Sequence, residues 1–279
     1  MDDLGYFGPD SVSWRLHGEP MQWVGGVRAL FLLALHPLVM AGVAQHSTYR
    51  QDPVGRLQRT GDYLAAVTFG TCAEADRAAA RVRGVHRRVR GVEPESGAPY
   101  RAPDPQLLLW VHCGQVDSFL TIGRRAGTRV SAADADRYVA EQVRAAELVG
   151  IPRELVPAST AELAGYFERT RPQLRTTAAA RATARWLFVP PMPTLVQFAT
   201  PARAAWASAA GLAFATLPRW ARRMYGSPGL PTTDLGASVT LRWLRAASAV
   251  LPESLREPPA YRAAKRRAAE TPVRRLSAV

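Results

Sequence analysis

Two short segments in the first third of the chain carry residues that could hold a metal cofactor. Residues 56–60 place two arginines and a threonine within five positions, and residues 85–91 set His86 among arginines. An imidazole can ligate haem iron, and guanidinium groups bind carboxylates through paired hydrogen bonds. All five histidines lie before residue 113, so any histidine chemistry must be built by the N-terminal half.

Four polar side chains around the first segment would share one face of a helix. Arg56, Arg59, Thr60 and Tyr63 stand at i, i+3, i+4 and i+7, a spacing that places them in a single stripe. The ordinary interpretation is a stripe that faces water. The functional interpretation is a stripe that faces carboxylates such as haem propionates, which arginine binds in bidentate fashion.

Three histidines stay open as ligands from the residues alone. His86 lies in an apolar stripe with Val82 and Val89, and His112 follows the apolar run 107–111. His36 precedes a proline, so it should lie at a helix break. A lone histidine on an apolar face is more often a hydrogen-bonded core residue than a ligand, so the pattern alone does not assign any of them.

Other kinds of catalytic site lack support in the sequence. Cys72 and Cys113 have no C-x-x-C or zinc-type spacing, and C-x-x-C-H is absent, so any haem would be held without thioether bonds. No Ser/His/Asp order, glycine-rich phosphate loop, His-Glu-x-x-His or paired-carboxylate pattern is present. Ordinary hydrolases and nucleotide-binding enzymes are therefore disfavoured.

The charge is strongly basic, yet it indicates no specific nucleic-acid partner. The formal net charge is +13, and Lys265 is the only lysine among 36 basic residues. Arginine is scattered over many segments instead of being gathered in one recognition element. A basic protein that binds nucleic acid or an anionic surface without a cofactor is one alternative that this charge leaves open.

The helix signals predict an all-α fold. Asp52-Pro53 should begin a helix that Gly70 ends, and Thr71 with Glu74 forms a capping box for a helix that should run to Gly91. Further helices are expected at 105–122, closed by Gly123, and at 131–150, 159–167, 176–188, 201–217, 218–225, 234–251 and 258–269. We expect one domain over 1–279, with a frayed basic tail from about residue 270.

The N-terminus and the apolar segments predict a cytoplasmic protein without a transmembrane segment. The first residues are acidic and lack the charged-then-apolar pattern of an export signal. The longest apolar stretch, 29–44, is interrupted by His36-Pro37 and is shorter than the ~20 residues that cross a bilayer.

Taken together, the motifs resemble one family of haem-dependent oxygenases, the MpaB-type and latex-clearing rubber oxygenases. The motifs that carry the resemblance occur in the family's order along nearly the whole chain: Trp14-Arg15, Leu35-His36-Pro37, His46-Ser47, Asp52-Pro53, Arg56-x-x-Arg59-Thr60, Phe69-Gly70, His86-x-x-Val89-x-Gly91, Tyr100-x-Ala102, Trp110-Val111-His112, Ala161-Glu162-Leu163, Tyr166-Phe167, Leu217-Pro218 and Tyr225-Gly226.

The resemblance implies an all-α fold around a non-covalent b-type haem, with His86 as the proximal iron ligand. Arg56, Arg59 and Thr60 would lie beside the haem, Arg59 and Thr60 as catalytic residues, while His112 and His36 remain further cofactor-binding candidates. Two departures bear on activity. Arg59 stands where rubber oxygenases carry a lysine, and arginine has no free lone pair for iron. No carboxylate occurs in 37–44, near the position of an acidic residue implicated in rubber cleavage.

We therefore expect a haem b-dependent oxygenase that uses dioxygen on a hydrophobic small molecule, with isoprenoids as one candidate class. A haem-binding or sensing protein without turnover is the first alternative. The cofactor-free basic interaction protein is the second.

Overall fold

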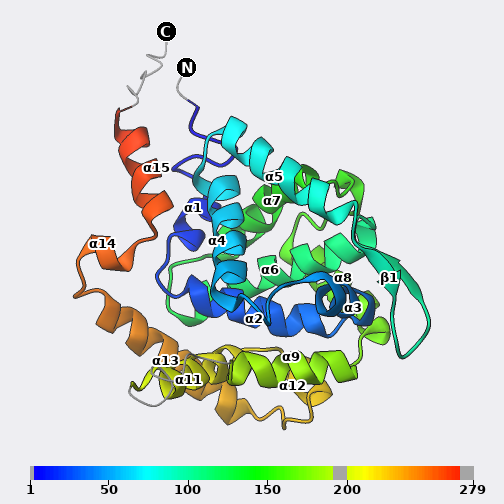
Figure 1. Cartoon of the computed structure of the whole chain (residues 1–279). Coiled ribbons are helices and arrows are strands. Elements are labelled where there is room, and N and C mark those ends of the chain that lie inside the picture. The colour runs from blue at the N-terminus through cyan, green and yellow to red at the C-terminus, as the bar shows by residue number, and fades with distance from the viewer. Residues whose placement is uncertain (1–2, 191–199, 271–279) are drawn as a thin grey trace.

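The computed structural model describes residues 3–190 and 200–270, which form a helical body with one small hairpin (Figure 1). Its elements are α1 (Val12–His17), α2 (Gln22–Ala34), α3 (Pro37–His46), α4 (Pro53–Phe69), α5 (Cys72–His86), β1 (Arg90–Val92), β2 (Pro99–Arg101), α6 (Pro105–Arg125), α7 (Ala132–Leu148), α8 (Thr160–Thr170), α9 (Ala178–Phe188), α11 (Ala202–Ala215), α12 (Arg219–Met224), α13 (Pro231–Ser248), α14 (Glu253–Arg256) and α15 (Pro259–Glu270).

Side-chain caps set the starts of the helices that surround the later site. The Asp52 carboxylate accepts a hydrogen bond from the Gly55 amide at 2.9 Å and begins α4. Thr71 and Glu74 exchange side-chain to backbone hydrogen bonds at the start of α5. Such caps satisfy amides that have no partner within the helix. The predicted starts of α4 and α5 are confirmed.

Two helix ends that were predicted at glycines are wrong, because each glycine instead allows close packing against another element. The helix α5 ends at His86, and Gly91 lies in β1, opposite Tyr100 of β2. A Cβ at Gly91 would stand 2.6 Å from the Tyr100 hydroxyl oxygen, so this glycine serves close strand pairing. The helix α6 continues past Gly123 to Arg125, because Gly123 lies against Leu16, whose Cδ2 would be 2.5 Å from an added Cβ. The antiparallel β1–β2 hairpin is the one sheet of the described residues, and its two three-residue strands leave the predicted all-α class intact.

One apolar cluster joins the two halves of the chain. It runs from Val12 to Leu241 and includes Phe31 and Leu32 of α2 with Trp110 of α6. The central helices α2 and α6 lie along each other, and α11 packs on α2. Helices on both sides of residue 190 therefore share a core. The predicted tail beyond residue 270 lies outside the described residues.

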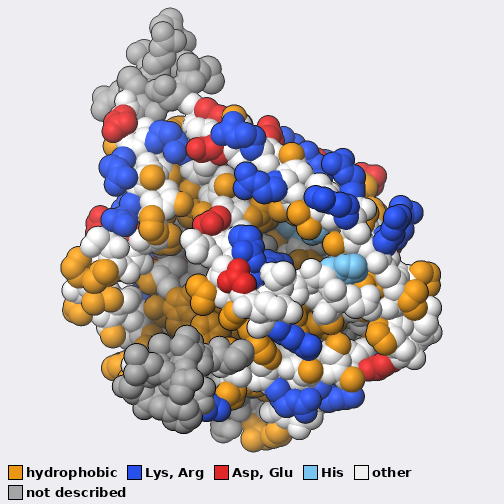
Figure 2. All heavy atoms as spheres, in the orientation of Figure 1, with side chains coloured by type: hydrophobic (Ala, Val, Ile, Leu, Met, Phe, Trp, Pro, Cys, Tyr) orange, Lys and Arg blue, Asp and Glu red, His pale blue; other side chains and the backbone are white. Residues whose placement is uncertain are grey.

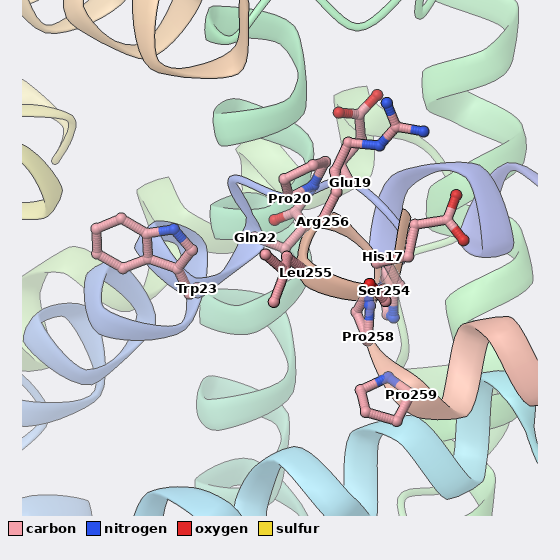
Figure 3. A pocket seen from close by; sticks show the side chains of 11 residues that line it. His17, Glu19, Pro20, Gln22, Trp23, Ser254, Leu255, Arg256, Pro258 and Pro259 are labelled. Carbon is pink, nitrogen blue, oxygen red and sulfur yellow. The ribbon is translucent and has the colours of Figure 1, made fainter. Parts of the chain in front are cut away.

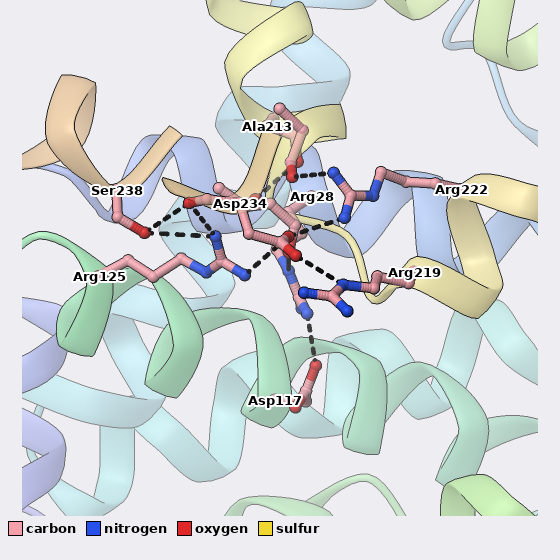
Figure 4. A network of polar contacts seen from close by, with 10 residues as sticks. Arg28, Asp117, Arg125, Ala213, Arg219, Arg222, Asp234 and Ser238 are labelled. Carbon is pink, nitrogen blue, oxygen red and sulfur yellow. Dashed lines mark hydrogen bonds and ion pairs between the residues drawn. The ribbon is translucent and has the colours of Figure 1, made fainter. Parts of the chain in front are cut away.

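Arginine pairs tie the C-terminal helices to this core. The Asp234 carboxylate of α13 accepts from Arg222 at 2.7 Å, Arg219 at 2.8 Å and Arg125 at 3.3 Å (Figure 4). Arg222 is only 1% exposed, so it depends on this carboxylate for charge compensation. Arg28, equally buried on α2, pairs with Asp117 at 2.7 Å.

Among the described residues, no single helix combines the length and the apolar composition that a bilayer span requires. The helices α2 and α3 reach both only as a pair, and they meet at a bend of 108°.

Candidate functional site

A cavity of about 800 Å³ lies among α3, α4, α5, α6 and α7. Its volume is within the range of cofactor and ligand pockets. Valines and leucines of four helices line it, among them Val43, Leu64, Val82 and Val111. In the space-filling view this face is hollowed below a row of basic side chains, with histidine side chains at the hollow (Figure 2). The apolar lining suits a hydrophobic ligand.

His86 reaches the cavity from the last turn of α5. Its Nδ1 is buried without a hydrogen-bond partner. Burial, and after it the positive charge of Arg56, lowers the pKa of the imidazole. A ring held neutral keeps a nitrogen lone pair, which is the form that ligates a metal. The sequence predicts this residue as a ligand, and the structure places it on the cavity wall with an unpartnered nitrogen.

The polar stripe of α4 also lines the cavity, although Arg56 and Arg59 are exposed in it. The Arg56 guanidinium donates to the Thr60 hydroxyl and, at 3.3 Å, to the Ser47 hydroxyl. The Thr60 hydroxyl donates in turn to the Arg56 carbonyl at 3.0 Å. Burial raises the pKa of Tyr63 to about 12, so the phenol stays protonated. The stripe therefore presents one cation and two neutral hydroxyls to the cavity.

Arg59 is held at the cavity edge by partners from its own end of α4. Its Nη1 lies 3.0 Å from the Asp52 carboxylate, and its Nη2 donates to the Thr48 hydroxyl at 3.2 Å. Its side chain is 56% exposed. The cap of α4 thus neutralises Arg59, and Arg56 is the stripe arginine that no described carboxylate pairs.

The other histidines differ in what their rings can do. His112 lines the cavity from α6, makes no hydrogen bond with a described residue, and burial lowers its pKa to about 4. His46 lines it as well, with its ring 6.3 Å from that of Tyr100. His36 is buried against Trp110 with an unpaired Nδ1, but it is not among the lining residues. Of the three open candidates, His86 and His112 therefore share the cavity and His36 does not.

His17 of α1 also lines the cavity, and both of its ring nitrogens already have hydrogen-bond partners. They lie within hydrogen-bond distance of the Thr68 hydroxyl, at 2.8 Å, and the Tyr138 hydroxyl, at 2.9 Å. Burial lowers the pKa of His17 to about 3. Because both nitrogens have hydrogen-bond partners inside the protein, this ring has no free nitrogen to ligate a metal.

The side chains of the cavity favour a metal cofactor in which most of the metal's ligands belong to the cofactor itself. No group of three or more His, Cys, Asp or Glu residues within the described part of the chain could hold a bare metal ion. A haem supplies four nitrogens itself and needs one axial imidazole from the protein. An orphaned neutral imidazole and an unpaired guanidinium on one apolar cavity fit that group.

Among the lining residues that the sequence did not predict are two glutamines. Gln115 lies three residues after His112 on α6, and Gln142 comes from α7, where its amide donates to the Ser13 hydroxyl at 2.9 Å. The i, i+3 spacing from His112 to Gln115 could have indicated the first. The carboxylates that line the cavity, Asp62 and Glu74, come from α4 and α5, and Glu74 already serves the cap of α5.

A second, smaller pocket of about 400 Å³ lies between the α1–α2 connection and α14 (Figure 3). Its acids are paired, Glu19 with Arg245 at 2.8 Å and Glu257 with Lys265 at 2.7 Å. The pocket offers no unpaired carboxylate for chemistry, so the larger cavity is the candidate site.

Comparisons with known proteins agree with the predicted fold and family. A family model described as "ER-bound oxygenase mpaB/B'/Rubber oxygenase, catalytic domain" matches residues 14–250. Two uncharacterized proteins, from Mycobacterium tuberculosis and Mycobacterium bovis, are each 31% identical over 133 residues, or 47% of this chain and 51% of theirs. The match thus spans about half the length of these relatives.

A solved structure of latex clearing protein in its closed state is similar in fold. The TM-score is 0.57 at 17% identity, and the match covers 92% of this chain and 73% of that one. At this identity the likeness concerns the arrangement of the helices only.

Proposed function

The chain belongs to the family of mpaB and rubber oxygenase catalytic domains, and from this premise we propose that it is an oxygenase that holds one b-type haem in the α3–α7 cavity. We further propose a hydrophobic small molecule as its substrate, with isoprenoids as one class, dioxygen as the co-substrate, and the cytoplasm as its location. The predicted family is confirmed. The cofactor and the substrate are proposals that rest on the residues of the cavity.

The observation that carries the proposal is the unpaired imidazole of His86 on the cavity wall. Its neutral nitrogen would hold the iron, since burial and Arg56 both disfavour its protonation. The alternative ligand is His112, which is also neutral and lines the same cavity. When bound, the haem would supply the redox chemistry toward dioxygen.

The other lining residues would bind and orient the cofactor and the substrate. The Arg56 guanidinium lacks an acidic partner among the described residues and would bind a propionate. Thr60 would hold that guanidinium in place, because its hydroxyl accepts a hydrogen bond from the Arg56 guanidinium and donates one to the Arg56 carbonyl. The valines and leucines would exclude water from the reacting part of an apolar substrate.

Haem binding tests the proposal directly. The purified protein should take up about one hemin per chain, and acid-acetone should extract the pigment because no thioether bond would hold it. His86→Ala should lose most of the pigment or change its Soret band, while His112→Ala should keep it. A colourless protein that takes up no added hemin would refute the haem proposal, and bleaching by His112→Ala alone would move the axial ligand to α6.

Two observations favour a second candidate, a haem-binding or sensing protein without turnover. The helix α3 brings no carboxylate to the cavity, and Arg59 is tied to Asp52. Incubation of the haem-loaded protein with an unsaturated lipid under dioxygen separates the two. Oxygenated products support the oxygenase, and their absence with intact haem supports the binding protein.

A further inference from the structure

Six arginines of α5, the turn after it and the β1–β2 hairpin have no acidic partner, and two of them line the cavity. We call them the basic rim: Arg77 and Arg81 of α5, Arg87 and Arg88 in the turn after it, Arg90 of β1 and Arg101 of β2. All six are exposed, and none forms an ion pair with a carboxylate of the described residues. Figure 2 shows a row of basic side chains along the edge above the hollow.

Two rim arginines face each other directly across the hairpin. Arg90 pairs with Arg101 in the β1–β2 register, so both side chains leave the same face of the two strands. Like charges opposite each other destabilise a strand pair. Nothing on the hairpin offsets this repulsion, and an anion bound outside the protein would do so.

The acidic residues nearest to the rim in sequence are turned to other partners. Asp76 accepts a hydrogen bond from the Tyr6 hydroxyl at 2.8 Å. Glu93 is buried in the hairpin turn and pairs with Arg175 at 2.6 Å. Glu95 accepts from the Ala178 amide at 2.6 Å. The pKa of Glu74 is lowered first by its hydrogen bond from the Thr71 amide and more weakly by the charge of Arg77. The other five rim arginines have no such neighbour among the acidic residues named here, and their charge is available to an external anion.

Two exposed valines lie in the same segments of the chain as the rim arginines. Val85 is 51% exposed and Val92 is 53% exposed. Arg77, Arg81 and Val85 also line the cavity itself. This combination of arginines and valines would match a partner that has negative charges at its surface and an apolar layer below them. A cavity that opens at such a surface could receive an apolar ligand directly, without passage through water.

We propose that the basic rim docks the protein on the surface of an anionic phospholipid bilayer, with the cavity mouth toward the lipid. Phosphate headgroups would pair with the rim arginines, and Val85 and Val92 would enter the headgroup layer. A nucleic acid would satisfy the charge but would leave both valines without an apolar partner. The inference rests on the cavity mouth and its charges and does not depend on a bound cofactor.

Vesicle sedimentation with a matched pair of variants tests this docking. The rim variant carries Arg87→Gln, Arg88→Gln, Arg90→Gln and Arg101→Gln, none of which lines the cavity. The control variant loses the same charge from exposed, unpaired arginines of other elements, namely Arg129, Arg169, Arg185 and Arg203, each changed to Gln. Vesicles of phosphatidylcholine alone, mixed phosphatidylglycerol and phosphatidylcholine vesicles, and a single-stranded oligonucleotide serve as the three probes.

Wild-type protein should sediment with the mixed vesicles, stay free of phosphatidylcholine vesicles, and detach as salt rises. Since each basic residue near an anionic surface strengthens binding roughly fivefold, the rim variant should bind at least about 20-fold more weakly. The control should stay within about twofold of wild type, because its charges lie away from the contact.

Several results would overturn the docking surface. These are equal binding to both vesicle types, an equal loss in the control variant, or rim-dependent binding of the oligonucleotide without binding of vesicles. Circular dichroism would show that the rim variant is folded, and hemin uptake of the same sample would remain at the wild-type level. A failure of hemin uptake in wild type leaves the vesicle result readable, so the two proposals fail separately.

Discussion

Mild acid should destabilise the folded protein through histidines that are buried in their neutral form. Burial lowers the pKa of His17 to about 3 and that of His36 to about 4. In the unfolded chain an imidazole titrates near pH 6.5. Between those values the unfolded state binds more protons than the folded state, so stability falls as the pH drops below about 6.5.

The size of this loss follows from the two pKa differences. At pH 5 an unfolded imidazole is almost fully protonated while the folded rings remain neutral, which costs about 2 kcal/mol per histidine relative to pH 7.5. These two histidines together remove about 4 kcal/mol from a total of about 5–15 kcal/mol for a typical domain, and His112, whose pKa burial also lowers to about 4, adds a similar loss in the haem-free protein. Carboxylates such as Asp52, whose pKa is lowered mainly by its hydrogen bond with Arg59, stop contributing to stability only at a more acidic pH.

Urea unfolding followed by circular dichroism at pH 7.5, 6 and 5 measures the loss. His17→Gln lowers stability at every pH because it disturbs the hydrogen bonds to Thr68 and Tyr138, but its further loss between pH 7.5 and 5 should be smaller by about 2 kcal/mol. His46→Gln is the matched control, because that ring is exposed. Wild-type stability that is unchanged at pH 5, or an equal effect of His46→Gln, would refute the reasoning.

Four further substitutions test particular contacts. Arg59→Ala should leave hemin uptake intact, since a guanidinium cannot ligate iron, and should cost at most about 1 kcal/mol in urea unfolding for its exposed pair with Asp52; loss of the pigment would contradict this. Asp234→Ala should cost about 3–5 kcal/mol, because it strands the buried guanidinium of Arg222; a cost near zero would show that other groups compensate. Gly91→Ala should destabilise by about 1–3 kcal/mol through its clash with Tyr100. Gly61→Ala, where an added Cβ meets nothing within 4 Å, should instead stabilise α4 by about 0.5–1 kcal/mol, and equal signs for the two would contradict the packing argument.

The sequence alone determined the helical class, the starts of most helices and the family. Capping residues such as Asp52 and Thr71 act on amides two or three residues away, so their effect is local and can be predicted from spacing. The stripe of Arg56, Thr60 and Tyr63 was likewise evident, because helical periodicity alone places these side chains on one face.

Only the tertiary structure decided what that face meets and where the glycines act. Gly91 and Gly123 look like helix ends in the sequence, but each lies against a side chain of another element, Tyr100 of the paired strand β2 in one case and Leu16 of α1 in the other. Close approach between two elements leaves no periodic signal in either of them.

The roles of the histidines depended on the fold in the same way. Five similar residues became a ring bonded at both nitrogens, a buried ring outside the cavity, and three rings on its wall. The pairing of Arg59 with Asp52, which separates it from Arg56 three residues earlier, also appears only in three dimensions. Burial and the partners of a polar group are properties of the packed chain, and residue type and spacing do not contain them.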